Sequence, residues 1–194
     1  TYYWGNGTRE QKEKAITSLL AYASSGIDYN EDIDIEIAGM LLQYRSILVV
    51  SDWQDLKERR NYNEIGNAEF GNLREKQKQE CKDIHDKHGI FLYNAVVQKK
   101  LEEVSSGARQ NIITGFYSFL EVLVRLQKFD LALKICDYVL NCAPKNFHSQ
   151  FQKKQEWFSS LLYKSTPKNH NKATANHELG EIGLKLKEAL KKRK

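Results

Sequence analysis

Three residues in one stretch of the chain have the side chains and the spacing of zinc ligands. Cys81, His85 and His88 stand at positions i, i+4 and i+7, so a straight α-helix would place all three on one face. Zinc favours thiolate and imidazole ligands, but three ligands in a row on one helix rarely complete a tetrahedral shell. A fourth ligand would have to come from elsewhere, for example from His170 or His177. A polar helix face is the simpler interpretation, and we assign neither a metal nor a cofactor.

Two acidic motifs could also bind a metal ion. Asp55-Leu56-Lys57 has the short spacing of a metal-dependent nuclease motif, in which carboxylates hold the metal and the lysine polarises a phosphate. That chemistry needs a strand, whereas the capping box Ser51-Asp52-Trp53-Gln54 places the triplet on a helix. A second acidic cluster consists of Glu31, Asp32, Asp34 and Glu36. It lacks the glycine and the later glutamate of a calcium-binding loop, so the start of a helix is the better interpretation. No catalytic residue is predicted, and the sequence favours a protein that is not an enzyme.

The excess positive charge lies at the C-terminal end. The formal net charge is +5, and the chain before residue 164 is close to neutral. A basic end can bind nucleic acid, an anionic membrane or an acidic partner, or it can simply increase solubility. The residues we assign to nucleic-acid binding are Lys185, Lys187, Lys191, Lys192, Arg193 and Lys194. Three aromatic residues at the other end, Tyr2, Tyr3 and Trp4, could stack on bases, but packing against the body is the preferred interpretation.

The N-terminal half of the chain is predicted to be helical. A capping box at Thr8-Arg9-Glu10-Gln11 predicts a helix over residues 8–25. Residues 32–37 alternate like a strand, but the longer apolar pattern that follows repeats at three and four, so we predict a helix here too. The capping box at Ser51 predicts a separate short helix that ends near Arg60. Four asparagines and two glycines then predict a loop over residues 61–72.

The C-terminal half shows the same helical periodicity. Apolar residues surround the segment from Ile112 to Leu126, so this helix is expected to be central. Its neighbours are predicted helices over residues 73–104, with a kink at Gly89, and over residues 129–140, 147–163 and 179–194. The predicted fold is all-α, an irregular helical domain centred on residues 84–163. We divide the chain into a helical domain (1–163), a polar linker (164–178) and a basic amphipathic C-terminal helix (179–194).

Composition restricts the cellular setting. No apolar run reaches the roughly 18 residues that span a bilayer, and the first residues lack the order of a signal peptide. The cysteines Cys81, Cys136 and Cys142 are odd in number and form no CxxC pair, which indicates reduced thiols. We therefore expect a cytoplasmic protein that does not interact with membranes.

Residues 113–146 resemble a single tetratricopeptide repeat, a unit of two antiparallel helices with interlocking large and small residues. Phe116 and Phe119 take the large positions of the first helix, and Pro144 takes the terminal proline. The small or apolar positions of the second helix are taken by Ala132, Cys136 and Val139. The sequence departs from the family at Leu120 and Leu123, where glycine and tyrosine are usual. Because only one repeat is recognisable, the resemblance implies a hairpin within a non-repetitive helical domain.

The same region resembles the small (endonuclease) terminase subunit of temperate contractile-tailed phages. The resemblance rests on Gly107-Ala108 before Ile112-Ile113-Thr114, on Phe129, Ala132-Leu133, Ile135, Tyr138-Val139-Leu140 and Phe147, and on Ile182-Gly183-Leu184-Lys185. The spacing from Gly107 to Ala132 is longer than in that family, and the proline that marks its entry is missing. The resemblance implies a component of viral genome packaging that works beside a large ATPase subunit. No catalytic residue is transferred from it.

Two functions follow from these observations. The first is a non-enzymatic helical docking or scaffold protein that binds a protein partner, with the basic tail adding electrostatic attraction. The alternative is a DNA-binding small subunit of a phage terminase, with nucleic acid bound through the tail. The partner's identity and the oligomeric state are not encoded in any motif.

Overall fold

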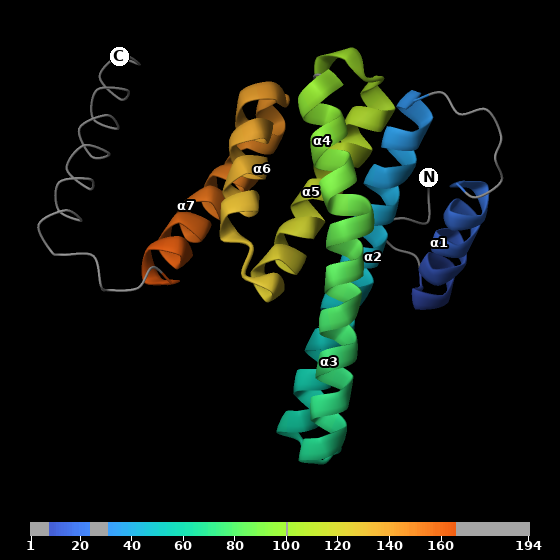
Figure 1. Cartoon of the computed structure of the whole chain (residues 1–194), viewed down its shortest axis with the longest axis vertical. Helices are drawn as coiled ribbons and strands as arrows, with labels where there is room; N and C mark the ends of the chain where they lie inside the picture. The colour runs from blue at the N-terminus through green and yellow to red at the C-terminus, as the bar shows by residue number, and fades with distance from the viewer. Residues whose placement is uncertain (1–7, 24–30, 100, 166–194) are drawn as a thin grey trace, which may run out of the picture. The chain divides into compact units, whose positions relative to one another are not determined.

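The computed structural model describes residues 8–23, 31–99 and 101–165, and every regular element within these ranges is a helix (Figure 1). The chain divides into two compact units, Thr1–Ser159 and Ser160–Lys194, and the features below belong to the first. The predicted all-α class is confirmed for this part of the chain. None of its helices is long and apolar enough to cross a membrane. The elements are α1 (Arg9–Ala23), α2 (Glu31–Asn61), α3 (Asn67–Ile84), η1 (His85–Gly89), α4 (Ile90–Lys99), η2 (Leu101–Glu103), α5 (Ser106–Leu126), α6 (Phe129–Cys142), η3 (Lys145–Phe147) and α7 (His148–Ser165).

The first helix begins with the capping box that the sequence predicts. The amide of Thr8 donates to Oε1 of Gln11 over 2.8 Å, and the amide of Gln11 donates to Oγ1 of Thr8 over 3.3 Å. These reciprocal bonds satisfy two amides that would otherwise have no partner at the start of a helix.

The second capping box does not start a helix, which corrects our prediction. Helix α2 runs without interruption from Glu31 to Asn61, so Ser51 lies inside it. No glycine or proline occurs between Met40 and Asn61, and nothing there prevents the backbone bonds from continuing. Buried residues on both sides of Ser51, Val49 and Leu56 among them, hold the whole length against its neighbours. Residues 32–37 are helical, as predicted.

The loop that we predicted over residues 61–72 is shorter than expected. Helix α3 already begins at Asn67, with Gly66 in an extended conformation at its N-terminal boundary. Glu69 lies in the first turn, where a carboxylate interacts favourably with the helix dipole. Asn63 has a φ of 56°, a left-handed conformation that asparagine adopts more readily than most residues. Gly71, which we placed in the loop, lies within α3.

A short π-helix, η1, lies where we predicted a kink. It covers His85–Gly89 and joins α3 to α4. Gly89 is buried, and a Cβ atom added to it would lie 2.2 Å from Cζ of Phe119. Because Phe119 is itself fully buried and has no room to move, only glycine fits at this position. The wider turn changes which side chains share a face of the helix.

The core is built on the crossing of α2 and α5, which make the most extensive contact between two helices in the described chain. Two glycines allow this approach: a Cβ added to Gly115 would lie 2.6 Å from the carbonyl oxygen of Gly39. Leu42, Tyr44 and Ile112 are fully buried around the crossing. From the sequence we predicted a domain centred on residues 84–163, and that prediction did not include α2 as the main partner of α5.

Helices α5 and α6 follow each other with a two-residue connection and lie side by side (Figure 1). Ser105 caps α5 by accepting a hydrogen bond from the amide of Ala108, and Gln127, with a φ of 57°, ends it. The rings of Phe116 and Tyr138 meet edge to face at 6.5 Å. The hydroxyl of Tyr138 donates to the carbonyl of Val96 and accepts from the amide of Leu101. The second helix of the pair is thereby attached to the end of α4.

Candidate functional site

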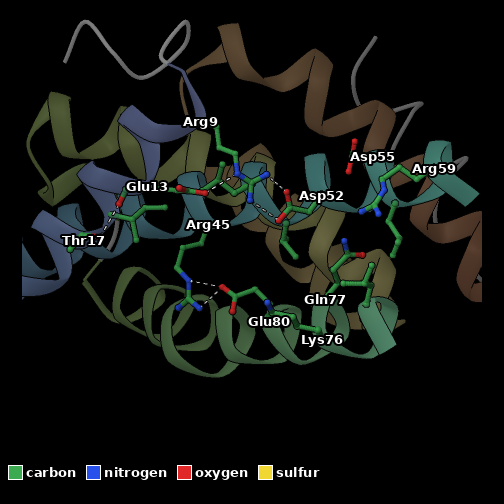
Figure 2. A pocket seen from close by; sticks show the side chains of 15 residues that line it. Arg9, Glu13, Thr17, Arg45, Asp52, Asp55, Arg59, Lys76, Gln77 and Glu80 are labelled. Atoms are coloured by element: carbon green, nitrogen blue, oxygen red, sulfur yellow. Dashed lines mark hydrogen bonds and ion pairs between the residues drawn. The ribbon is translucent and has the colours of Figure 1, made fainter. Parts of the chain in front are cut away.

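A cavity of about 610 Å³ lies among α1, α2 and α3 (Figure 2). Its lining combines aliphatic side chains with a set of ionised ones of both signs. The aliphatic part is Ile16, Leu48, Val49, Leu56 and Leu73, and the ionised part is Arg9, Arg45, Arg59, Lys76, Glu13, Asp52, Asp55 and Glu80. The charges balance, so this cavity has no preference for a ligand of either sign.

The charges of this cavity hold its helices together. Arg9 donates from Nη2 to Oδ2 of Asp52 over 3.1 Å, and from Nε to Oε1 of Glu13 over 2.8 Å. The hydrogen bond to Asp52 is the main reason why the pKa of Arg9 is raised. Figure 2 shows this pair connecting α1 to α2 across the cavity. Among the described residues, this lining contains no histidine, cysteine or serine.

A half-buried ionic network joins α2 to α3 and η1. Arg45 donates from Nη2 to Oε1 of Glu80 over 2.6 Å and to Oδ2 of Asp83 over 3.0 Å. Its Nη1 lies 2.8 Å from Nε2 of His88. Arginine can only donate, so Nε2 must accept and the imidazole must be neutral. Burial, and then the charge of Arg45, lower the pKa of His88 to about 4.

A second pocket, of about 480 Å³, is lined mainly by positive charge. We call it the basic pocket. Its five cationic side chains are Arg74, Lys78, Lys82, Arg125 and Lys128. The rest of the lining is Trp53, His85, Asp86, Leu126 and Gln127. Among the described residues that line it, Asp86 is the one carboxylate, and it pairs with Nδ1 of His85 over 2.6 Å.

The cations of the basic pocket come from three places in the fold. Arg74, Lys78 and Lys82 repeat at every fourth residue of α3, so they form one row along that helix, and all three are exposed. Lys128 stands in the turn between α5 and α6 and is also exposed. None of these four side chains forms an ion pair with a residue that the structure describes. Such a cluster lacks internal neutralisation and favours an anionic ligand.

Arg125 and Trp53 line the basic pocket side by side. The guanidinium carbon of Arg125 lies 5.4 Å from the ring centroid of Trp53, in the range of a cation–π contact. Nη1 of Arg125 donates to the carbonyl of Glu121 over 2.8 Å, which holds the side chain on α5. Its Nε is buried and has no hydrogen-bond partner in the described chain. The contact with Arg125 favours this position of the Trp53 ring.

The three residues with the spacing of zinc ligands do not converge. Cys81 is fully buried, and burial raises the pKa of its thiol to about 11, so it is protonated at neutral pH. His85 interacts with Asp86, whereas His88 interacts with Arg45. Because the π-helix interrupts the α-helical spacing, the i, i+4, i+7 pattern does not give a shared face. No group of three or more ligand-type side chains in the described ranges is arranged to hold a metal ion.

The other candidates have structural positions or lie elsewhere. Asp55-Leu56-Lys57 is within α2, with Leu56 buried and the two charged residues exposed, so the triplet is helical, as we expected. The acidic cluster is in the first turns of α2, where Glu36 accepts a hydrogen bond from Nδ2 of Asn111. Outside the described residues lie His170, His177, the aromatic residues Tyr2, Tyr3 and Trp4, and the whole tail with Lys185, Lys187, Lys191, Lys192, Arg193 and Lys194.

Comparison with known proteins found no matching family model, no matching curated protein and no matching solved structure. The resemblances to a tetratricopeptide repeat and to a terminase subunit therefore stay predictions. The basic pocket was not predicted from the sequence. One signal was available, namely the spacing of Arg74, Lys78 and Lys82 by four residues, but the position of Trp53 and Lys128 beside them depends on the tertiary fold.

Proposed function

We propose that this chain is a non-enzymatic helical docking protein that binds an anionic macromolecular partner through the basic pocket. The observation that carries the proposal is the exposed cluster of Arg74, Lys78, Lys82 and Lys128, which has no ion-pair partner among the described residues. Cations held without counter-charges on a folded surface raise the local concentration of anionic ligands and speed their association. The basic tail, where the sequence places further positive charge, adds to the same attraction.

The chemistry of the cavity among α1, α2 and α3 and of the basic pocket supports docking rather than catalysis. In the first cavity Arg9 pairs with Asp52 and Arg45 pairs with Glu80, each between two helices. In the basic pocket the one imidazole among the described lining residues is paired with Asp86. Burial raises the pKa of Cys136 to about 12, as it also raises that of Cys81, so neither thiol is poised as a nucleophile. All three cysteines are free thiols. A reducing compartment such as the cytoplasm is therefore part of the proposal.

The proposal is tested by reversing charges inside and outside the basic pocket. The probes are polyglutamate and a sulfated polysaccharide, and the protein is the full chain at low ionic strength. Arg74→Glu together with Lys78→Glu should weaken binding of both probes by about tenfold or more. Both residues are exposed on α3, so these changes should leave the melting temperature nearly unchanged.

A matched control changes the net charge by the same amount elsewhere on the body. Lys14→Glu on α1 together with Lys134→Glu on α6 serves this purpose, because both side chains are exposed and neither lines the basic pocket. The control should bind the probes nearly as well as the unaltered chain. Equal losses in the two double variants would mean that only total charge matters. The proposed function would be wrong if neither these probes nor any nucleic acid bound to the chain.

A further inference from the structure

The row of cations on α3 has the form that a regularly charged polymer needs. Arg74, Lys78 and Lys82 follow each other by one helical step of four residues, which corresponds to about 6 Å along the helix axis. Each of the three is exposed and can reach a separate anionic group. A single small anion would use one or two of them and leave the others without a partner. A chain of phosphates would use the whole row.

The pocket beside this row can hold a flat group. Its volume of about 480 Å³ lies within the range of roughly 300–1,000 Å³ that is usual for sites of small organic ligands. Trp53, in contact with Arg125, lines the pocket and adds an aromatic side chain to it. Gln127, exposed at the end of α5, lines the same pocket and brings an amide that can both donate and accept hydrogen bonds. An aromatic ring and an amide are groups that recognise a nucleobase.

A single strand fits this combination better than a duplex or an acidic protein. In a duplex the bases are stacked and paired, and moving one into a pocket costs a few kcal/mol. In a single strand the bases are already free to stack on an aromatic side chain while the phosphates follow a basic groove. An acidic peptide could neutralise the cations but would leave the aromatic wall without a use.

We propose that the basic pocket binds single-stranded nucleic acid, with phosphates on Arg74, Lys78, Lys82 and Lys128 and one unpaired base against Trp53. This inference rests on the proposed function, because it names the class of anionic partner that the same site accepts. Binding follows the shape and charge of the strand, and the site reads little base sequence.

The experiment measures the affinity of the full chain for four polyanions by fluorescence anisotropy. They are an oligothymidylate of about 16 nucleotides, a duplex of the same length, an abasic strand of the same length, and polyglutamate. The oligothymidylate should bind about tenfold more tightly than the abasic strand, because one stacked base contributes in that range. With about four phosphates neutralised, its affinity should fall about 50-fold between roughly 50 and 200 mM salt.

Variants separate the base from the phosphates. Trp53→Leu should weaken binding of the oligothymidylate about tenfold and leave binding of the abasic strand nearly unchanged. Trp53→Phe keeps an aromatic ring and should restore most of the loss. Arg74→Glu with Lys78→Glu should weaken binding of both strands and make the dependence on salt less steep.

The outcomes distinguish the failure of this inference from the failure of the proposed function. If the abasic strand or the duplex binds as tightly as the oligothymidylate, no base enters the pocket and the inference is wrong. If polyglutamate binds and the oligothymidylate binds no better, the site is a docking surface for acidic proteins, and the proposed function stands without the inference. If no polyanion binds, both are wrong.

Discussion

His88 is held in the neutral state by its surroundings. The side chain is 9% exposed, and Arg45 points a donor at its Nε2. A proton added to Nε2 would break this hydrogen bond and place a second cation beside Arg45, with Lys87 a further positive charge nearby. Asp83, the one neighbouring carboxylate that favours the protonated imidazole, acts more weakly than burial and Arg45. The folded protein therefore resists protonation of this residue.

The stability of the protein should consequently fall as the pH is lowered from 7 to 5. The pKa of His88 is about 4 in the folded chain, whereas a histidine in the unfolded chain has the ordinary value of 6.5. Below pH 6.5 His88 binds a proton in the unfolded chain but not in the folded chain. Lowering the pH therefore favours unfolding until the pH falls below the pKa of His88 in the folded chain. The expected loss in the free energy of unfolding is about 2 kcal/mol between pH 7 and pH 5. Urea denaturation at several pH values measures it.

The control replaces His88 by a group that accepts a hydrogen bond but does not titrate. In His88→Gln the amide oxygen can accept from Arg45, so the variant should fold, and its stability should change little between pH 7 and pH 5. Asp83 does not complicate this range: its pKa is lowered, so its contribution is lost only when the pH falls below the usual value for a carboxyl. Parallel pH curves for the two proteins would show that His88 is not the responsible group.

At the scale of helices, the closest contact in the core is the crossing of α2 and α5. Gly115→Ala would place a Cβ atom 2.6 Å from the carbonyl oxygen of Gly39, and backbone atoms cannot move aside as a flexible side chain can. The helices would have to separate, at a cost of about 1–3 kcal/mol. Thermal denaturation should therefore show a clearly lower melting temperature.

Gly71 provides the matched control for this prediction. It lies in α3, its position is exposed, and a Cβ atom there would meet nothing within 4 Å. Gly71→Ala should raise stability by about 0.5–1 kcal/mol, because alanine loses less conformational entropy in a helix than glycine does. If both alanine variants behaved alike, the close approach of the two helices would not be the feature that Gly115 supports.

The pair α5 and α6 offers a second test of the core. Phe116 and Ala132 are both fully buried, and we predict that they face each other across the pair. Phe116→Ala would leave a cavity and should cost about 3–5 kcal/mol. Ala132→Leu would overpack the same region and should cost about 1–3 kcal/mol. If the melting temperature stayed unchanged in both variants, the packing of this pair would have to be revised.

The helices were predictable from the sequence where local signals act alone. Thr8 and Gln11 begin α1 with reciprocal hydrogen bonds that need no other part of the chain. Ser51 carries the same pattern, yet α2 continues through it, because buried contacts on both sides outweigh a local cap. The π-helix before Ile90 depends on the fit of Gly89 against Phe119, and this contact joins residues far apart in the sequence.

For the whole molecule, the candidate site could be predicted only in part. Positive charge at the C-terminal end is visible in the sequence, but it lies outside the described residues. The basic pocket depends on α3 passing the turn between α5 and α6 beside Trp53 of α2. Periodicity predicts the row of cations on one helix, whereas it carries no information about which distant residues will stand next to that row. The pocket therefore became visible only with the tertiary fold.

The last prediction separates the body of the protein from its tail. From the sequence, nucleic-acid binding is predicted for the tail, and the fold adds the basic pocket on the first unit. A chain that ends at Thr174 lacks Lys185, Lys187, Lys191, Lys192, Arg193 and Lys194 and keeps the whole basic pocket. It should bind all strands more weakly by a common factor. Its affinity should also fall less steeply with salt: the slope of the logarithm of affinity against the logarithm of salt concentration should become shallower by about 0.7 for each lost phosphate contact.

The preference for a strand with bases should survive this truncation. Trp53 and Arg125 remain in place in the shortened chain, so the oligothymidylate should still bind about tenfold more tightly than the abasic strand. Anisotropy titrations of both chains with both strands at two salt concentrations measure the slope and the preference together. If the shortened chain binds neither strand at low salt, the tail carries all of the affinity for nucleic acid and the basic pocket does not act by itself. If truncation changes neither the affinity nor the slope, the tail makes no contact with phosphates, and its assignment from the sequence is wrong.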